Sequence, residues 1–359
     1  ESVLAEYAEK RILVTGGAGC IGSNLVQTLL QAEPEKIIII DDLSASHLWN
    51  IPKSPQVVFI HGSVLDDEKM REAFSLKPQY IFHLAAHFAN QNSIDHPEND
   101  LLTNALGTLK TLRYAVKTDC KRFVYASSGC SVYGNHAPLP LKEDFVSLHL
   151  DTPYQITKLV GELYCNFFYN YYKLPVVNAR YFNVFGPREV PGKYRNVIPN
   201  FIWWAMQERP LPITGTGKET RDFTYVGDII EGTLRMGVFE EAVGEAINLA
   251  SGTETRILDV AEQINNITGN PAGLEYQPVR DWDKIKRRRA SIEKAGKLLG
   301  YTPKTSFRAG LKRTYEWFLE FSDEIEQAVA REVSWVEKYA RPDNSATVSS
   351  RHGRRRDTC

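Results

Sequence analysis

Short apolar runs alternate with segments of helical apolar spacing through the first half of this 359-residue chain. Strands that are apolar along nearly their whole length are buried on both faces, and intervening helices make neighbouring strands parallel. The alternation therefore predicts an α/β fold, a Rossmann-type doubly wound parallel sheet with helices on both faces. The predicted strands span residues 11–15, 36–41, 57–61, 80–85 and 122–127, and the helical segments span 21–32, 66–75 and 104–117.

The second half is less regular and predicts a smaller, mixed domain. We expect residues 1–180 to form the first domain and residues 181–340 the second, with a return of the chain to the first domain left open. From 341 to 359 the chain is polar and lacks periodicity, which predicts a disordered tail. The predicted elements are helices over 153–172, 226–239, 257–268, 292–299 and 307–339, and a strand over 176–182.

Composition argues against several classes of function. The net charge of -1 disfavours a nucleic-acid-binding surface, and we interpret the basic runs at 287–289 and 354–356 as solvated surface. No apolar run approaches the ~18 residues that span a membrane. The five cysteines form no C-x-x-C pair, so neither a metal site nor a disulfide framework is predicted, and a reducing cytoplasm is the expected compartment.

A glycine-rich turn, VTGGAGCIGSNL, follows the first predicted strand and opens the first helix. Its glycines let the backbone turn tightly and approach a pyrophosphate, which the helix N-terminus attracts. Asp41 ends the second strand 19 residues after Gly22, where a carboxylate binds the adenosine ribose of a dinucleotide. The stretch 41–50 has no Arg or Lys for a 2′-phosphate, so the pattern favours NAD over NADP. The alternative is a tight turn without a ligand.

Tyr154 and Lys158 share one face of the helix predicted over 153–172, because they are four residues apart. A free Tyr titrates at about pH 10, and a neighbouring ammonium or a nicotinamide cation favours its phenolate. A Tyr tuned in this way removes a proton from a sugar hydroxyl while NAD takes a hydride from the same carbon. An isolated Y-x-x-x-K indicates a surface pair, but behind a nucleotide-binding half the catalytic interpretation is favoured.

These features together resemble the extended short-chain dehydrogenase/reductase family, in particular its NAD-dependent sugar-nucleotide epimerases and dehydratases of the UDP-glucose 4-epimerase type. The resemblance runs from about residue 11 to about residue 318. The motifs that carry it are TGGAGCIG (15–22), FHLAA (82–86), the serine run before VYG (127–134), PYQITK (153–158), RYFNVFGPR (180–188) and TRDFTYVGD (220–228).

The resemblance implies roles for individual residues. Tyr154 and Lys158 are the implied catalytic pair, and Lys158 also binds the nicotinamide ribose. The implied cofactor-binding residues are Gly16, Gly19, Cys20, Ile21, Gly22, Asp41, Leu43, Ser44, Ser63, Val64, Leu84, Ala85, Ala86 and Asn104, with Ser63 standing where the family usually has Asp. The implied substrate-binding residues are Asn183, Asn196, Val197, Pro212, Ile213 and Arg221, with Arg280, Asp281 and His87 as weaker candidates.

The stretch SSGCSVYG (127–134) contains the candidates for the catalytic hydroxyl. Counting back from Tyr133 puts the family's hydroxyl position on Gly129, which has none, whereas counting forward from the strand puts it on Ser128. We therefore predict that Ser128 bonds the reacting sugar oxygen, with Ser127 as the second choice and one inserted residue before VYG. Cys130 has no recognisable base partner and is expected to pack rather than to react.

The same stretch bears on the reaction. Dehydratases of the family carry an Asp-Glu pair just before VYG and decarboxylases a Glu, whereas this chain has Cys130 and Ser131. The resemblance therefore implies an NAD-dependent UDP-hexose 4-epimerase that acts through a transient 4-keto sugar, with UDP chosen by family frequency. The alternatives are a UDP-glucuronate decarboxylase or UDP-uronate 4-epimerase and, more remotely, a non-catalytic NAD-binding scaffold.

Two predicted helices, around 102–116 and over 153–172, carry apolar residues all round, including FFYNYY at 167–172. In the family these helices form a four-helix interface, which implies a homodimer. The alternative is that their apolar residues belong to an ordinary core.

Overall fold

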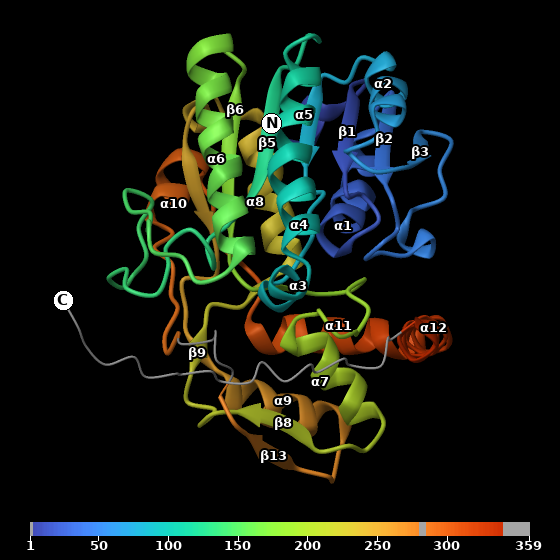
Figure 1. Ribbon diagram of the computed structural model, residues 1–359, viewed down its shortest axis with the longest axis vertical. Helices are drawn as coiled ribbons and strands as arrows, with labels where there is room; N and C mark the ends of the chain where they lie inside the picture. Colours follow the sequence, from blue (N-terminus) through green and yellow to red (C-terminus); the bar gives the residue numbers. More distant parts are fainter. Residues whose placement is uncertain (1–2, 280–284, 340–359) are drawn as a thin grey trace, which may run out of the picture.

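A seven-stranded parallel sheet forms the larger lobe in the computed structural model, which describes residues 3–279 and 285–339. Its strands follow the order β11-β6-β5-β4-β1-β2-β3, so the chain winds outward in both directions from the centre (Figure 1). The predicted doubly wound fold is confirmed. The strands are β1 (Arg11–Thr15), β2 (Lys36–Asp41), β3 (Val57–His61), β4 (Tyr80–His83), β5 (Arg122–Ser128), β6 (Val176–Tyr181) and β11 (Ala246–Leu249).

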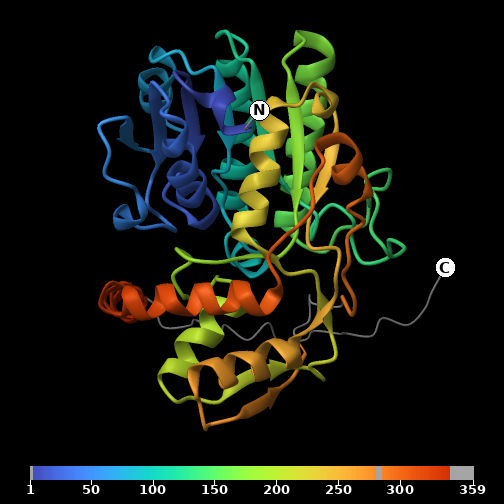
Figure 2. The same cartoon turned by 180° about the vertical axis from the view of Figure 1, so that it is seen from behind.

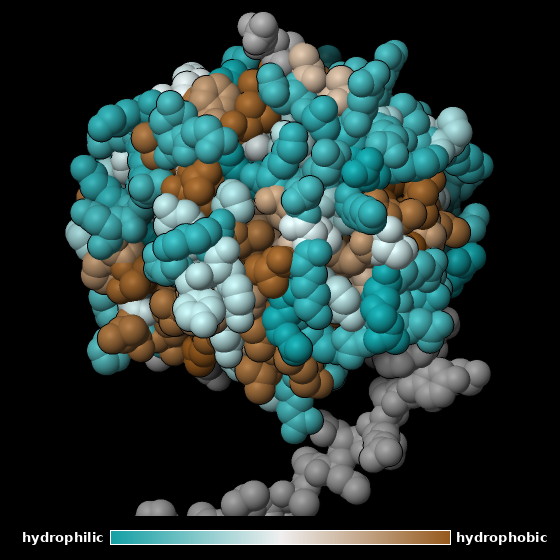
Figure 3. Space-filling view, turned by 90° about the horizontal axis from the view of Figure 1, so that it is seen from above, coloured by the Kyte–Doolittle hydropathy of each residue, from teal (hydrophilic) through white to brown (hydrophobic). Residues whose placement is uncertain are grey.

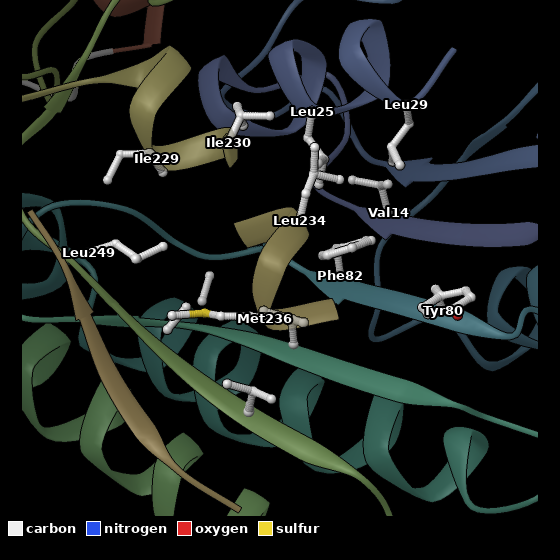
Figure 4. Packing of buried hydrophobic residues seen from close by; sticks show 14 of the residues in the cluster. Val14, Leu25, Leu29, Tyr80, Phe82, Ile229, Ile230, Leu234, Met236 and Leu249 are labelled. Atoms are coloured by element: carbon white, nitrogen blue, oxygen red, sulfur yellow. The ribbon is translucent and has the colours of Figure 1, made fainter. Parts of the chain in front are cut away.

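Successive residues of each strand face opposite sides of the sheet, and each side has its own hydrophobic layer. On β2, Ile37 and Ile39 pack in the layer of α1 and α8, whereas Ile38 and Ile40 pack in the layer of α2, α5 and α6. Figure 2 shows α8 lying across one face of the sheet. Figure 4 shows Leu234 of α8 in the hydrophobic layer that α1 and α8 form on this face. The helices of this lobe are α1 (Cys20–Leu29), α2 (Asp67–Ser75), α3 (Asn90–Asp95), α4 (Pro97–Asp100), α5 (Gly107–Ala115), α6 (Pro153–Tyr172), α8 (Val226–Val238) and α10 (Glu293–Leu299).

A smaller lobe lies beneath the carboxyl ends of the sheet strands (Figure 1). It is built on two parallel strands, β8 (Leu211–Thr214) and β13 (Leu274–Gln277), and has a hydrophobic cluster of its own. Its chain is not continuous, because residues 226–249 return to the larger lobe as α8 and β11, which pairs with β6. The remaining elements are α7 (Val197–Met206), α9 (Ile257–Thr268), α11 (Phe307–Glu320), α12 (Ser322–Tyr339) and the short pairs β7 (Val184–Phe185) with β10 (Thr224–Tyr225) and β9 (Thr220–Arg221) with β12 (Thr255–Arg256).

Two predicted helices differ in the structure. The helix predicted over 307–339 is wrong as one element, because Phe321 leaves the helical conformation (φ −111°, ψ 28°) between α11 and α12. The acidic residues that follow Ser322 are typical of a helix start and favour a new helix there. The helix predicted over 104–117 begins instead in a π-helical turn (Leu101–Leu106) that leads into α5. The predicted tail, 341–359, lies outside the described residues.

Membrane insertion finds no support in the helices. Within residues 3–279 and 285–339, no helix is both long enough and apolar enough to cross a bilayer.

Candidate active site

A cavity of about 1370 Å³ is lined by residues at the carboxyl ends of the sheet strands and by residues of the smaller lobe. The turns after β1, β2, β4 and β5 form one wall, and residues 188–197, α7 and β8 form the opposite wall. Open parallel sheets bind ligands outside the carboxyl ends of their strands. The cavity therefore stands where this fold places an active site.

Glycines shape the turn between β1 and α1. Gly16 has φ +69°, and a Cβ there would lie 2.8 Å from the backbone nitrogen of Ala85. A Cβ on Gly22 would overlap the carbonyl oxygen of Gly16. Gly19 is the N-cap of α1, so unpaired backbone N–H groups of the helix begin at the cavity wall. The turn leaves open the space that an anionic pyrophosphate needs beside a helix N-terminus.

The carboxylate of Asp41 lies beside this glycine turn at the end of β2. Its Oδ2 accepts a hydrogen bond from the Ala18 amide at 2.9 Å, and its Oδ1 accepts from the Leu43 amide at 2.9 Å and the Ser46 hydroxyl at 2.7 Å. Asp41 and Ser44 line the cavity, but Leu43 does not. With φ +59°, Leu43 contributes its amide to the loop, and its contact with the cofactor stays a prediction.

The other predicted cofactor residues lie along the same wall, with one exception. Asn104 is buried behind the wall, where its Oδ1 accepts from the His87 amide at 2.8 Å and its Nδ2 donates to Asp100 at 2.8 Å. It therefore holds the loop after β4 and does not line the cavity. The residues that line it are Gly16, Gly19, Cys20, Ile21, Gly22, Ser63, Val64, Leu84, Ala85 and Ala86.

Most predicted substrate residues line the cavity as well. Ile213 is the exception, because alternation along β8 turns Pro212 to the cavity and buries Ile213 in the core of the smaller lobe. Nη1 of Arg221 donates to the carbonyls of Thr220 at 2.9 Å and Ile285 at 3.1 Å, which fixes the guanidinium at the wall. The lining residues are Asn183, Asn196, Val197, Pro212, Arg221 and His87, whereas Arg280 and Asp281 lie outside the described residues.

Tyr154 and Lys158 lie together on the first two turns of α6, and both line the cavity. Nζ of Lys158 is 5.7 Å from the centroid of the Tyr154 ring and donates to the carbonyl of Ala126 at 2.9 Å. Burial lowers the pKa of Lys158 to about 8. Burial, and then the charge of Asp100, raises the pKa of Tyr154. Burial and the charge of Asp100 thus act on the pKa of Tyr154 against the expected effect of the ammonium.

Two serine hydroxyls meet at the end of β5. Oγ of Ser131 donates to Oγ of Ser128 at 2.9 Å, because the turn after the strand brings residues three apart together. Both residues line the cavity. Ser127 lines it too, but its hydroxyl donates to Glu162, which is also bound by Arg180. Ser131 was missing from the predicted site, since only the turn geometry makes it a partner of Ser128.

Gly129 and Cys130, between these two serines, are packed against neighbouring residues. A side chain on Gly129 would overlap the ring of Phe182, so this position cannot carry the catalytic hydroxyl. The thiol of Cys130 donates to Oδ1 of Asn183 at 3.1 Å, and burial raises the pKa of the thiol. A protonated, hydrogen-bonded thiol is a poor nucleophile, as a packing role for Cys130 requires.

The basic run 287–289 is only partly solvated surface. Arg287 points outward, but Arg288 is 2% exposed and lines the cavity. Its Nη1 donates to the carbonyl of Gly134 and its Nη2 to the carbonyl of Cys130, both at 2.9 Å. In an extended segment neighbouring side chains face opposite sides, so one member of a charged run is carried inward. The prediction of a fully solvated run is corrected for Arg288.

The family of the chain follows from a sequence match that covers most of this site. Residues 12–250 match the model of the NAD dependent epimerase/dehydratase family, and this range holds the glycine turn, Asp41, Ser128, Tyr154 and Lys158. The chain belongs to this family. The predicted resemblance is confirmed, and NAD is the cofactor of the family.

Similar proteins extend the match over most of the chain. The structure of the epimerase Mth375 from Methanothermobacter thermautotrophicus is 56% identical, with a TM-score of 0.90 over 91% of this chain and 97% of that one. The UDP-glucose 4-epimerase of Mycolicibacterium smegmatis is 33% identical over 311 residues, 86% of this chain and 98% of the relative. The UDP-N-acetyl-alpha-D-glucosaminuronate decarboxylase of Bacillus cytotoxicus is 33% identical over 326 residues, 88% of this chain and 100% of the relative. The chain is thus an NAD-dependent enzyme of nucleotide sugars.

The residues of this epimerase/dehydratase fit a dinucleotide. The pyrophosphate fits the space that a Cβ on Gly16 or Gly22 would fill, and the ribose of the adenosine fits beside Asp41. One cation near that ribose was not predicted. Arg195 lines the cavity and donates to the carbonyl of Ala45, 150 residues earlier in the chain. Residues 41–50 contain no Arg or Lys, but Arg195 brings a positive charge to this loop from a distant part of the chain.

Contacts between the two lobes surround the loop after β2. Trp49, in the loop after β2, stacks on Trp317 of α11 and on Phe321, with centroid distances of 5.8 and 5.7 Å. Nη1 of Arg188 donates to the Ser23 carbonyl of α1 at 3.0 Å. The loop after β2 is thus held against the C-terminal helices.

Proposed function

We propose that this enzyme is a UDP-hexose 4-epimerase. The observation that carries the proposal is a cavity lined by Tyr154, Lys158 and Ser128 beside the NAD cradle, with no Asp or Glu in residues 127–134. Epimerisation at C4 requires a base for one hydroxyl proton and access to both faces of the sugar. It requires no additional acid to expel a leaving group. Tyr154 of α6 provides the base, and residues 127–134 carry no carboxylic acid that could expel a leaving group.

The proposed roles follow from the contacts of each group. Bound NAD supplies the acceptor and donor of hydride. Tyr154 takes the proton of the C4 hydroxyl during oxidation and returns it during reduction. Lys158 places a positive charge beside Tyr154 and lowers the cost of its phenolate. Because Ser131 donates to Ser128, the hydroxyl of Ser128 keeps its own proton free for the reacting sugar oxygen.

A direct assay separates the proposed reaction from decarboxylation. Incubated with UDP-glucose, the purified enzyme is expected to form UDP-galactose without net consumption of NAD, because hydride returns to the same carbon. Product identity is measured by chromatography against standards, and UDP-glucuronate is tested in parallel with detection of CO2. Release of CO2 from UDP-glucuronate, without conversion of UDP-glucose, would contradict the proposal.

Arg288 favours a second candidate, a UDP-uronate 4-epimerase. Its guanidinium is held in the cavity wall beside Cys130, and a guanidinium binds a carboxylate in a charge-assisted pair. Such a pair would recognise a carboxylate on the sugar without acting as an acid. Formation of UDP-galacturonate from UDP-glucuronate, faster than conversion of UDP-glucose and without CO2, would identify this activity.

We also propose that the enzyme is a homodimer through α5 and α6. Figure 3, a view from above, shows hydrophobic residues gathered along the lower edge of the picture, the side on which α5 and α6 face the viewer in Figure 1. Leu163 and Phe167 of α6 are 57% and 49% exposed, and Leu102 before α5 is 43% exposed. An apolar surface of this kind on adjacent helices is typical of an interface between copies.

Leu163→Glu is expected to convert the dimer to a monomer, because a charge would be buried without a partner at the interface. Leu148→Glu is the matched control, since Leu148 is 88% exposed and lies on neither helix. Sedimentation velocity at micromolar concentration measures both. A monomeric unmodified protein, or a dimer that survives Leu163→Glu, counts against this interface.

A further inference from the structure

A buried carboxylate lies behind the proposed catalytic pair. Asp100 ends α4 and is 0% exposed. Its Oδ2 accepts a hydrogen bond from the hydroxyl of Thr157 at 2.7 Å, and Thr157 lies on α6 between Tyr154 and Lys158. Asp100 does not line the cavity, so substrate and cofactor do not reach it. Its contacts instead restrain the helix that carries the catalytic pair.

The second oxygen of this carboxylate restrains the opposite side of the site. Oδ1 of Asp100 accepts from Nδ2 of Asn104 at 2.8 Å. This bond orients the amide of Asn104 so that its Oδ1 accepts from the His87 amide at 2.8 Å. His87 lines the cavity. The π-helical turn that follows Asp100, an irregularity common at functional sites, places Asn104 between the carboxylate and this loop.

We propose that Asp100 is a positioning residue of the active site. It links α6 to the loop after β4 and places a negative charge behind Tyr154 and Lys158. The inference rests on the proposed catalytic role of these two residues. A carboxylate held by one hydroxyl and one amide, and buried beside a Tyr and a Lys, restricts their positions and their charge states together.

The electrostatic effect has a definite sign. Titratable groups face the catalytic pair from several elements. Asp100 from α4, Tyr125 from β5 and Cys130 from the turn after β5 act on Tyr154, beside Lys158 of α6, and His83 from β4 faces Lys158. Among these, Asp100 raises the pKa of Tyr154, in addition to burial, and raises the pKa of Lys158 against the effect of burial. Removing the charge therefore lowers the pKa of Tyr154, and the phenolate forms at lower pH.

The decisive variant is Asp100→Asn, which keeps the size and one acceptor but removes the charge. The acid limb of the kcat profile is expected to shift to lower pH. A difference absorbance titration against the same variant carrying Tyr154→Phe reports the phenolate directly and is expected to shift in the same direction. Asp100→Ser, which is smaller and also uncharged, is expected to shift the acid limb to lower pH as well. It provides the test if Asp100→Asn does not fold.

Two controls separate this role from a general loss of stability. Thr157→Val removes the hydrogen bonds of the Thr157 hydroxyl to Asp100, Asn104 and the Tyr154 carbonyl but keeps the charge of Asp100. We therefore expect kcat to fall with a smaller shift of the acid limb than Asp100→Asn gives. Asp228→Asn alters another buried carboxylate, which accepts from the amides of Lys304 and Thr305, and is expected to lower the melting temperature without moving the limb.

The outcomes also separate this inference from the proposed function. Unchanged profiles for both Asp100 variants, or shifts to higher pH, would overturn the role of Asp100 alone, provided that Tyr154→Phe is inactive. Near-normal turnover by Tyr154→Phe would instead overturn the catalytic pair on which the inference rests.

Discussion

Replacement of Tyr154 by Phe is expected to lower kcat for UDP-sugar epimerisation by about 10²–10⁴-fold and to leave NAD bound. The substitution removes only the oxygen that takes the sugar proton. The ring itself is 8% exposed and packs edge-on against Phe88 at 6.0 Å, so the shape of the cavity is retained. Turnover is measured with UDP-glucose, and bound NAD is quantified after denaturation of the purified variant. Near-normal turnover would falsify the assignment of Tyr154 as the base.

Two companion variants locate the hydroxyl that assists Tyr154. Ser128→Ala is expected to lower kcat by about 10²-fold, the usual loss for one donor to a reacting oxygen. Cys130→Ala, at the next side chain along the turn, is expected to keep most of the activity because its thiol is protonated and bonded to Asn183. The reverse result, with Cys130 essential and Ser128 dispensable, would show that the wrong group of this turn has been chosen.

Gly22→Ala is expected to abolish NAD binding and to lower the free energy of unfolding by about 1–3 kcal/mol. The new Cβ would overlap the carbonyl oxygen of Gly16 and lie 2.7 Å from Cα of Gly17. Both obstacles are backbone, so the turn itself has to move, and this turn is the cradle of the pyrophosphate. Calorimetric titration with NAD and thermal unfolding of the NAD-free protein measure the two effects.

Gly19→Ala provides the matched control within the same turn. A Cβ on Gly19 meets only the carbonyl oxygen of Gly16, at 3.4 Å, so the free protein is expected to accept it with little change in melting temperature. Because Gly19 lines the cavity, the methyl group added by Gly19→Ala is nevertheless expected to weaken NAD binding. Unchanged NAD affinity in both variants would exclude this turn as the cofactor site.

Features that depend on neighbours in sequence were predictable from the sequence. The strand runs and the glycine turn are local, as is the spacing of Tyr154 and Lys158 on one helix face. The helices α6 and α9 begin and end at the predicted residues. Their boundaries are marked locally, since α6 starts after a Thr N-cap with Pro in its first turn and α9 ends at Gly269 in the left-handed conformation.

Features created by distant segments were not predictable. Arg195 reaches the loop after β2 across 150 residues, and Arg288 is turned inward by a segment that pairs Ala290 with Leu141. A basic residue in a polar stretch looks like surface unless its partners are known. The ring of Phe321, at the break between α11 and α12, likewise stacks on Trp49 from the first half of the chain.

The return of the chain through β11 determines when the larger lobe can be completed. β11 pairs with β6 and ends at Leu249, so about two thirds of the chain must leave the ribosome before the sheet has all its strands. A fragment that stops at residue 180 would also lack α8, whose Ile229 and Leu234 cover one face of the sheet. It would expose an apolar face and an unpaired edge of β6, both of which promote aggregation. The two lobes therefore cannot be separated by a single cut of the chain.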